Sequence, residues 1–227
     1  MKSGRKARAV QEELEKTPLV VVLIYDAGGK PGIYITSKHR KSFDLLTPIR
    51  VPAHLLEGPM SEGQTSEGSL EIGVIIGVGN ASELSQLVDS YKSSVIAEVS
   101  TIGLDEGLAD RALDSLTEEM NEAYRSSAYD IPLRVELLLI SFMGEIKLVR
   151  IKSDGDYHEL VGFGVIGGYT TGADGKSLRS RALEVLMNFN QSKKRIPTKA
   201  EAIKLGDRIL ALDTRPAIFT YKTHIGT

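Results

Sequence analysis

A threonine at the head of the first apolar run is the residue best placed to act as a nucleophile. Thr17 is followed by Pro18 and then by the continuous apolar run at residues 19–25. A threonine that becomes the first residue of a chain can use its own α-amine as the base, because an amine with a pKa of about 7.7 to 8 accepts the hydroxyl proton at neutral pH. Catalysis would therefore require cleavage between Lys16 and Thr17. The alternative is that Thr17 is only the entry to a strand.

A glycine-rich segment at residues 162–167 has the spacing of a dinucleotide-binding motif. Gly162, Gly164 and Gly167 match the pattern G-x-G-x-x-G. In a nucleotide-binding fold, a helix begins inside the motif so that its N-terminus holds the pyrophosphate. Here residues 165–166 continue an apolar strand, and residues 169–171 delay the next helix. The sequence instead indicates strand-end glycines that allow close packing.

The other chemistry-bearing residues follow no known catalytic or metal-binding pattern. The histidines at positions 39, 54, 158 and 224 contain no i, i+4 pair, so their spacing predicts no metal site. The absence of cysteine excludes disulfides, thiolate ligands and a cysteine nucleophile. The sequence also has neither a G-x-S-x-G elbow nor a P-loop. We expect no cofactor and no metal.

Four basic residues in the first quarter of the chain could form a docking patch. They are Lys38, Arg40, Lys41 and Arg50. A cluster of this kind can bind the C-terminal carboxylate of a partner protein. Surface cations more often form a solvated face without a partner. Both interpretations remain open.

The composition is that of an ordinary globular protein. The chain has 227 residues, of which 41% are hydrophobic and 26% charged. A net charge of −2 at pH 7 gives no general attraction to nucleic acid or anionic membranes. No apolar run approaches the roughly 18 to 20 residues that span a membrane, and the N-terminus lacks the apolar core of a secretory signal. We therefore expect a cytoplasmic protein with no nucleic-acid or membrane partner.

The first part of the chain is predicted to contain one helix and several strands. Apolar residues at helical spacing predict a helix at residues 4–15, within an extension at residues 1–16. Apolar runs predict strands at residues 19–25, 33–36 and 70–78. Two prolines limit residues 45–56 to an edge strand or loop, and the Gly-, Ser- and Glu-rich residues 57–69 are predicted to be a mobile loop.

The rest of the chain is predicted to hold two helix pairs separated by strands. Asn80 as N-cap begins a helix that ends near Val99, and Asp105 begins a second helix that ends near Ser127. A three-stranded antiparallel meander is predicted at residues 133–142, 145–152 and 157–166. The second helix pair and the last strand are predicted at residues 172–189, 197–212 and 217–221.

Runs of strands that alternate with helix pairs predict an α+β fold. Two antiparallel sheets would pack face to face, and a helix pair would cover the outer side of each sheet. We therefore expect a four-layer αββα sandwich, formed as a single domain by residues 17–227.

This order of elements resembles that of proteasome subunits and their N-terminal-nucleophile hydrolase relatives. In residues 133–168, strands joined by an Asp-Gly turn end in glycines before a helix. This segment resembles the matching region of proteasome subunits. Residues 70–94 resemble the strand, small-residue turn and first long helix of the family, and residues 197–212 resemble its late helix. The predicted helix at residues 4–15 resembles the N-terminal helix of α-type subunits of the actinobacterial and archaeal kind.

The resemblance implies a non-catalytic subunit. In catalytic β-type relatives, a glycine usually precedes the threonine and an acidic residue lies near the end of the second strand. This sequence has Lys16 at the first position and Ser37-Lys38-His39-Arg40 at the second. Lys38 and Lys41 are the nearby candidates for the lysine that lowers the proton affinity of the threonine.

The leading hypothesis is an α-type subunit in a homo-oligomeric ring, where it forms a chamber wall or gate or docks an activator. Catalytic β-type subunits and an ATPase activator are the further partners that the resemblance implies. Two alternatives remain open. One is a divergent threonine peptidase that processes itself at Thr17, and the other is a free-standing binding or assembly protein on the same fold.

Overall fold

A computed structural model of the chain describes residues 17–39, 46–55, 68–125, 135–143, 145–213 and 219–226. The helix predicted at residues 4–15 lies outside these ranges, as do residues 57–67 of the predicted loop. None of the helices in these ranges combines the length and apolarity that crossing a membrane requires.

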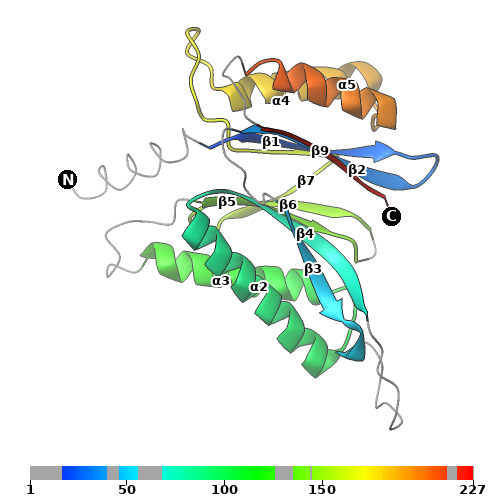
Figure 1. Cartoon of the computed structure of the whole chain (residues 1–227), viewed down its shortest axis with the longest axis vertical. Coiled ribbons are helices and arrows are strands. Elements are labelled where there is room, and N and C mark those ends of the chain that lie inside the picture. Colours follow the sequence, from blue (N-terminus) through cyan, green and yellow to red (C-terminus); the bar gives the residue numbers. More distant parts are fainter. Residues whose placement is uncertain are drawn as a thin grey trace.

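Two antiparallel sheets form the centre of the α+β fold (Figure 1). The four-stranded sheet contains, in spatial order, β8 (Phe163–Ile166), β1 (Leu19–Asp26), β2 (Pro31–His39) and β9 (Phe219–Gly226). The five-stranded sheet contains β3 (Leu46–Pro52), β4 (Ser69–Gly79), β5 (Val135–Ser141), β6 (Lys147–Ile151) and β7 (Tyr157–Leu160). A 3₁₀ turn, η1 (Ala53–Leu55), follows β3, which lies at an edge as its prolines predict.

Each sheet is covered on its outer side by two helices (Figure 1). The helices α2 (Ala81–Ile102) and α3 (Leu108–Arg125) share a buried apolar cluster with the five-stranded sheet. The helices α4 (Leu178–Lys193) and α5 (Lys199–Leu210) share another with the four-stranded sheet. A third cluster lies between the two sheets. These three clusters separate four layers, in the order helices, sheet, sheet, helices.

The first strand illustrates why the two sheets pack together. Successive side chains of a strand point to opposite faces. In β1, Val21 and Leu23 therefore face α4 and α5, while Val20 and Val22 face the other sheet. All four side chains are buried, which confirms that the continuous apolar run is a strand covered on both faces.

The third strand of the predicted meander is two strands that belong to different sheets. We expected one strand at residues 157–166, but β7 pairs with β6 in the five-stranded sheet and β8 pairs with β1 in the four-stranded sheet. The change occurs at Val161 and Gly162, where Gly162 has a φ of 78°. Glycine adopts this left-handed conformation without the steric cost of a Cβ. The chain therefore crosses from one layer to the other in two residues.

The helix starts follow their capping residues. Asn80 accepts hydrogen bonds from the amides of Ser82 and Glu83, as predicted for an N-cap. Helix α4 begins at Leu178 rather than near residue 172, because Ser177 is its N-cap and residues 171 and 177 first form a β-bridge. The start of α3 was also predicted too early, since the helix begins at Leu108.

Candidate functional site

Thr17 lies at the head of β1 and is enclosed by neighbouring elements. Thr17 is only 5% exposed to solvent. On one side, Ser37 of β2 donates a 3.0 Å hydrogen bond to the carbonyl oxygen of Leu19. On the other side lies Gly167, just after the end of β8. A Cβ added to Gly167 would lie 3.0 Å from the hydroxyl oxygen of Thr17. Thr17 is thus buried in the full-length chain.

A buried carboxylate beside the head of β1 accepts hydrogen bonds from four donors. Glu136 of β5 is 2% exposed. One carboxylate oxygen accepts from Nε of Arg150 and, at 2.7 Å, from Nη1 of Arg179. The other accepts from the amide of Gly167 at 3.0 Å and from the hydroxyl of Tyr169 at 2.9 Å. A charge in this position is tolerated only because it is paired and hydrogen-bonded.

This Glu136 cluster, which consists of Glu136, Arg150, Tyr169 and Arg179, joins three layers. Glu136 and Arg150 belong to the five-stranded sheet, Tyr169 follows the end of the four-stranded sheet, and Arg179 lies in the first turn of α4. The Arg179 guanidinium lies 5.4 Å from the centre of the Tyr169 ring, a distance at which cation–π attraction contributes. The cluster therefore fixes both sheets and α4 relative to one another.

The protonation of Tyr169 favours a structural role for the cluster. Burial raises the pKa of Tyr169, and the negative charge of Glu136 raises it further. The phenol therefore keeps its proton at neutral pH, where it can donate to Glu136. General acid or base catalysis instead requires a group with a pKa near the working pH.

The predicted docking residues do not form one patch among the residues that can be described. Lys38 of β2 donates to the backbone oxygen of Asp213, beyond the end of α5. Arg50 of β3 lies in the other sheet, 3.5 Å from the carboxylate of Glu71. Arg40 and Lys41 lie outside the described residues. The two placed cations thus each have an acceptor of their own.

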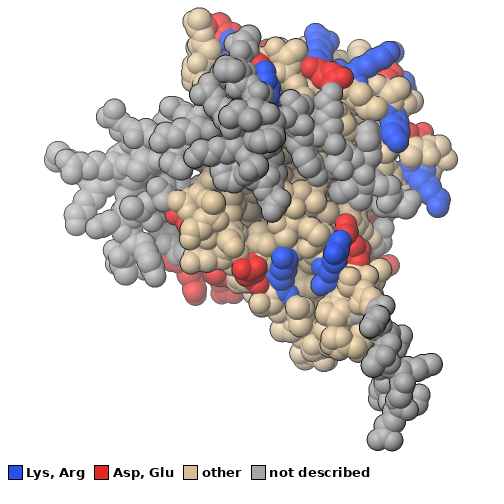
Figure 2. All heavy atoms as spheres, in the orientation of Figure 1, with Lys and Arg blue, Asp and Glu red and all other residues tan. Residues whose placement is uncertain are grey.

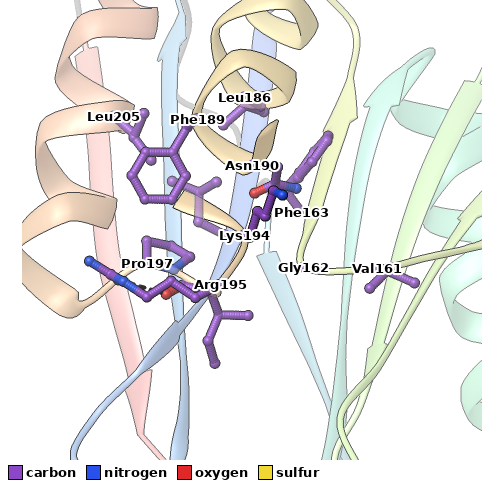
Figure 3. A pocket seen from close by; sticks show the side chains of 12 residues that line it. Val161, Gly162, Phe163, Leu186, Phe189, Asn190, Lys194, Arg195, Pro197 and Leu205 are labelled. Carbon is purple, nitrogen blue, oxygen red and sulfur yellow. Dashed lines mark hydrogen bonds between the residues drawn. The ribbon is translucent and has the colours of Figure 1, made fainter. Parts of the chain in front are cut away.

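A pocket opens in the layer formed by α4, α5 and the four-stranded sheet (Figure 3). Its volume is about 250 Å³. The apolar part of its wall consists mainly of Leu23, Phe163, Leu186, Phe189 and Leu205. Lys194 and Arg195, between α4 and α5, line it as well.

Comparison with known proteins adds no identification. The sequence matches no protein-family model, and no curated protein matches it. The functional interpretation therefore depends on the fold and on the residues described above.

Two glycines of the apparent nucleotide motif, Gly164 and Gly167, allow close packing, whereas Gly162 has a φ of 78° and open space around it. Residues 163–166 form β8, and the next helix begins only at Leu178, so no helix starts inside the motif. A Cβ on Gly164 would lie 3.0 to 3.2 Å from side chains of Leu138, Leu148 and Leu160 in the facing sheet. Within the described ranges, no group of three or more potential metal-binding side chains gathers either.

Sequence analysis did not identify the Glu136 cluster. Its one signal is an acidic residue inside the apolar run of β5, where an unpaired carboxylate would be costly. The side-chain partners of Glu136 are 14, 33 and 43 residues away in sequence. Only the folded arrangement of β6, the end of β8 and α4 brings them to it.

Figure 2 shows one face of the molecule, on which basic and acidic side chains lie interspersed. This mixture is in keeping with the small net charge of −2. The described residues visible on this face form no broad electropositive surface for a polyanion.

Proposed function

We propose that this chain is a non-catalytic α-type subunit of a proteasome-like, homo-oligomeric ring. It would form part of a chamber wall or gate, or a docking surface for an ATPase activator, alongside catalytic β-type subunits. The four-layer packing of two antiparallel sheets between two helix pairs supports the proposal, because it agrees with the architecture that the sequence resemblance implies. A fold alone does not determine a function, so the non-catalytic role needs support from the residues of the site.

The sequence around Thr17 and its surroundings in the fold support the non-catalytic part of the proposal. Lys16 precedes Thr17, at the position where self-processing β-type relatives usually have a glycine. The hydroxyl of Thr17 is enclosed by the end of β8. Lys38, the nearest described candidate for an activating lysine, directs its ammonium group to Asp213.

The test combines the intact mass of the purified protein with peptide hydrolysis by the wild type and by Thr17→Ala. We expect a full-length mass, no hydrolysis that depends on Thr17, and rotationally symmetric rings in negative-stain images of both proteins. A mass that begins at Thr17, together with hydrolysis that Thr17→Ala abolishes, would establish the peptidase alternative. A full-length protein that never forms rings would instead favour the free-standing binding protein.

A further inference from the structure

The pocket between α4, α5 and the four-stranded sheet has the size of a site for one apolar side chain. Its volume of about 250 Å³ is below the roughly 300 to 1,000 Å³ of typical small-molecule sites. Val161, which lines it, is 88% exposed, and Ile196 is also exposed. A small apolar pocket bordered by exposed apolar residues is typical of a hot spot that receives an anchor residue from a protein partner.

Among the described residues at this pocket, Lys194 has the charge that no ion pair neutralises. The neighbouring Arg195 makes two hydrogen bonds of 2.8 Å to the carboxylate of Glu201. For the exposed side chain of Lys194, the structure gives no acceptor among the described residues. A partner that enters the pocket therefore meets an unneutralised ammonium group.

The backbone of Lys194 fixes where this side chain leaves the end of α4. Of the non-glycine residues that the structure describes, Lys194 alone has a left-handed backbone, with a φ of 51°. A side chain in this conformation costs roughly 1–2 kcal/mol relative to the right-handed helix, and glycine is the usual residue there. Lys194 is the C-cap of α4, where its amide donates to the carbonyl oxygen of Asn190, so the end of the helix accounts for this conformation and leaves the side chain exposed at the pocket.

The turn between α2 and α3 carries the complementary chemistry. Ile102 and Leu104 are 57% and 40% exposed. Asp105 is held by Arg111 at 3.1 Å. The exposed carboxylate of Glu106 attracts Lys147 from a longer distance but forms no ion pair within the described part of the chain. Two protruding apolar side chains and one available carboxylate thus follow one another in five residues, 102–106.

We propose that the α2–α3 turn of a second copy of the chain docks at this pocket, with its apolar side chains against the pocket and Glu106 paired with Lys194. The inference rests on the proposed ring, for which it supplies a subunit contact. The pocket belongs to the layer of α4 and α5, whereas the turn belongs to the opposite outer layer (Figure 1). The contact is therefore heterologous, and heterologous contacts generate rings when successive rotations close.

A charge swap tests the contact. Lys194→Glu and Glu106→Lys each place like charges opposite one another, and we expect each to weaken assembly about tenfold or more in analytical ultracentrifugation. The double variant restores opposite charges at every contact, so its assembly should return to within about threefold of the wild type. Arg208→Glu, near the C-terminal end of α5, and Glu118→Lys, on α3, make the same charge changes at exposed positions away from the contact and should assemble normally.

The outcomes separate the contact from the ring. If the wild type assembles and the single variants assemble equally well, or if the double variant fails to recover, this contact is wrong and the ring proposal stands. A wild type that stays monomeric at every concentration overturns both. Circular dichroism of each variant verifies that loss of assembly is not loss of folding.

Discussion

At the scale of single residues, Glu136 is the side chain on which most of the local order depends. It neutralises two guanidinium groups and accepts hydrogen bonds from a backbone amide and a phenol. Removing one partner of a buried ion pair is strongly destabilising, because the remaining charge stays desolvated.

We therefore expect Glu136→Ala to lower the free energy of unfolding by about 3–5 kcal/mol, measured by urea denaturation. Glu184→Ala is the matched control, since Glu184 pairs with Lys176 on the surface, where both side chains are more than half exposed. That change should have little effect. Equal losses in the two variants would contradict the central role given to the cluster.

Gly167 is the second residue on which the head of β1 depends. Its φ is 67°, and a Cβ there would lie 1.9 Å from the carbonyl oxygen of Pro18. Gly175 has a similar φ of 76°, but a Cβ there would meet nothing within 4 Å. The two glycines thus separate backbone strain from steric clash.

We expect Gly175→Ala to cost about 1–2 kcal/mol of stability through backbone strain alone. Gly167→Ala should cost about 1–3 kcal/mol more, because the added methyl group forces β1 and the end of β8 apart. Thermal and urea unfolding of both variants measure the difference. Similar losses of stability in the two variants would contradict the close contact between Gly167 and the head of β1.

At the scale of elements, the start of α5 combines a capping box with an ion pair. Thr198 accepts a hydrogen bond from the amide of Glu201, whose carboxylate accepts from the amide of Thr198. Arg195 also binds that carboxylate, and these hydrogen bonds lower the pKa of Glu201 to about 2 from an ordinary value of 4.5. The protonation of Glu201 is therefore linked to folding.

The direction of this linkage follows from the lowered pKa. As the pH falls, the unfolded chain takes up the proton first, so the contribution of Glu201 is complete above about pH 4.5 and is lost as the pH approaches 2. We expect Arg195→Gln to reduce the loss of stability over this interval, as measured by urea denaturation at a series of pH values. Arg208→Gln, an exposed change elsewhere on α5, should retain the wild-type slope.

The elements that sequence patterns predicted well are those with strong local signals. The apolar run of β1 and the Pro197-Thr198 start of α5 lie where they were expected. The sequence pattern predicted β7 and β8 as one strand, because strand-favouring residues continue from one to the other. Only Gly162, with its left-handed backbone, marks the change of sheet. The start of α4 was placed too early because residues 172–175 also look like a helix start. A local β-bridge between residues 171 and 177 delays the helix to Leu178.

At the scale of the whole molecule, three apolar clusters hold four layers together. The order of strands and helix pairs was enough to predict this layering, because each sheet and each helix pair has an apolar face to bury. The position of Thr17 at the head of β1 was also predictable. Its enclosure by Gly167 was not, since it depends on how β8 approaches β1.

The central claim is that full-length subunits assemble into a ring, and native mass spectrometry of the purified protein tests it most directly. It reports the mass of the subunit and the size of the assembly in one experiment. We predict full-length subunits in a closed ring or stacked rings of one discrete size. Subunits that begin at Thr17 would contradict the non-catalytic role, and a full-length monomer would contradict the ring.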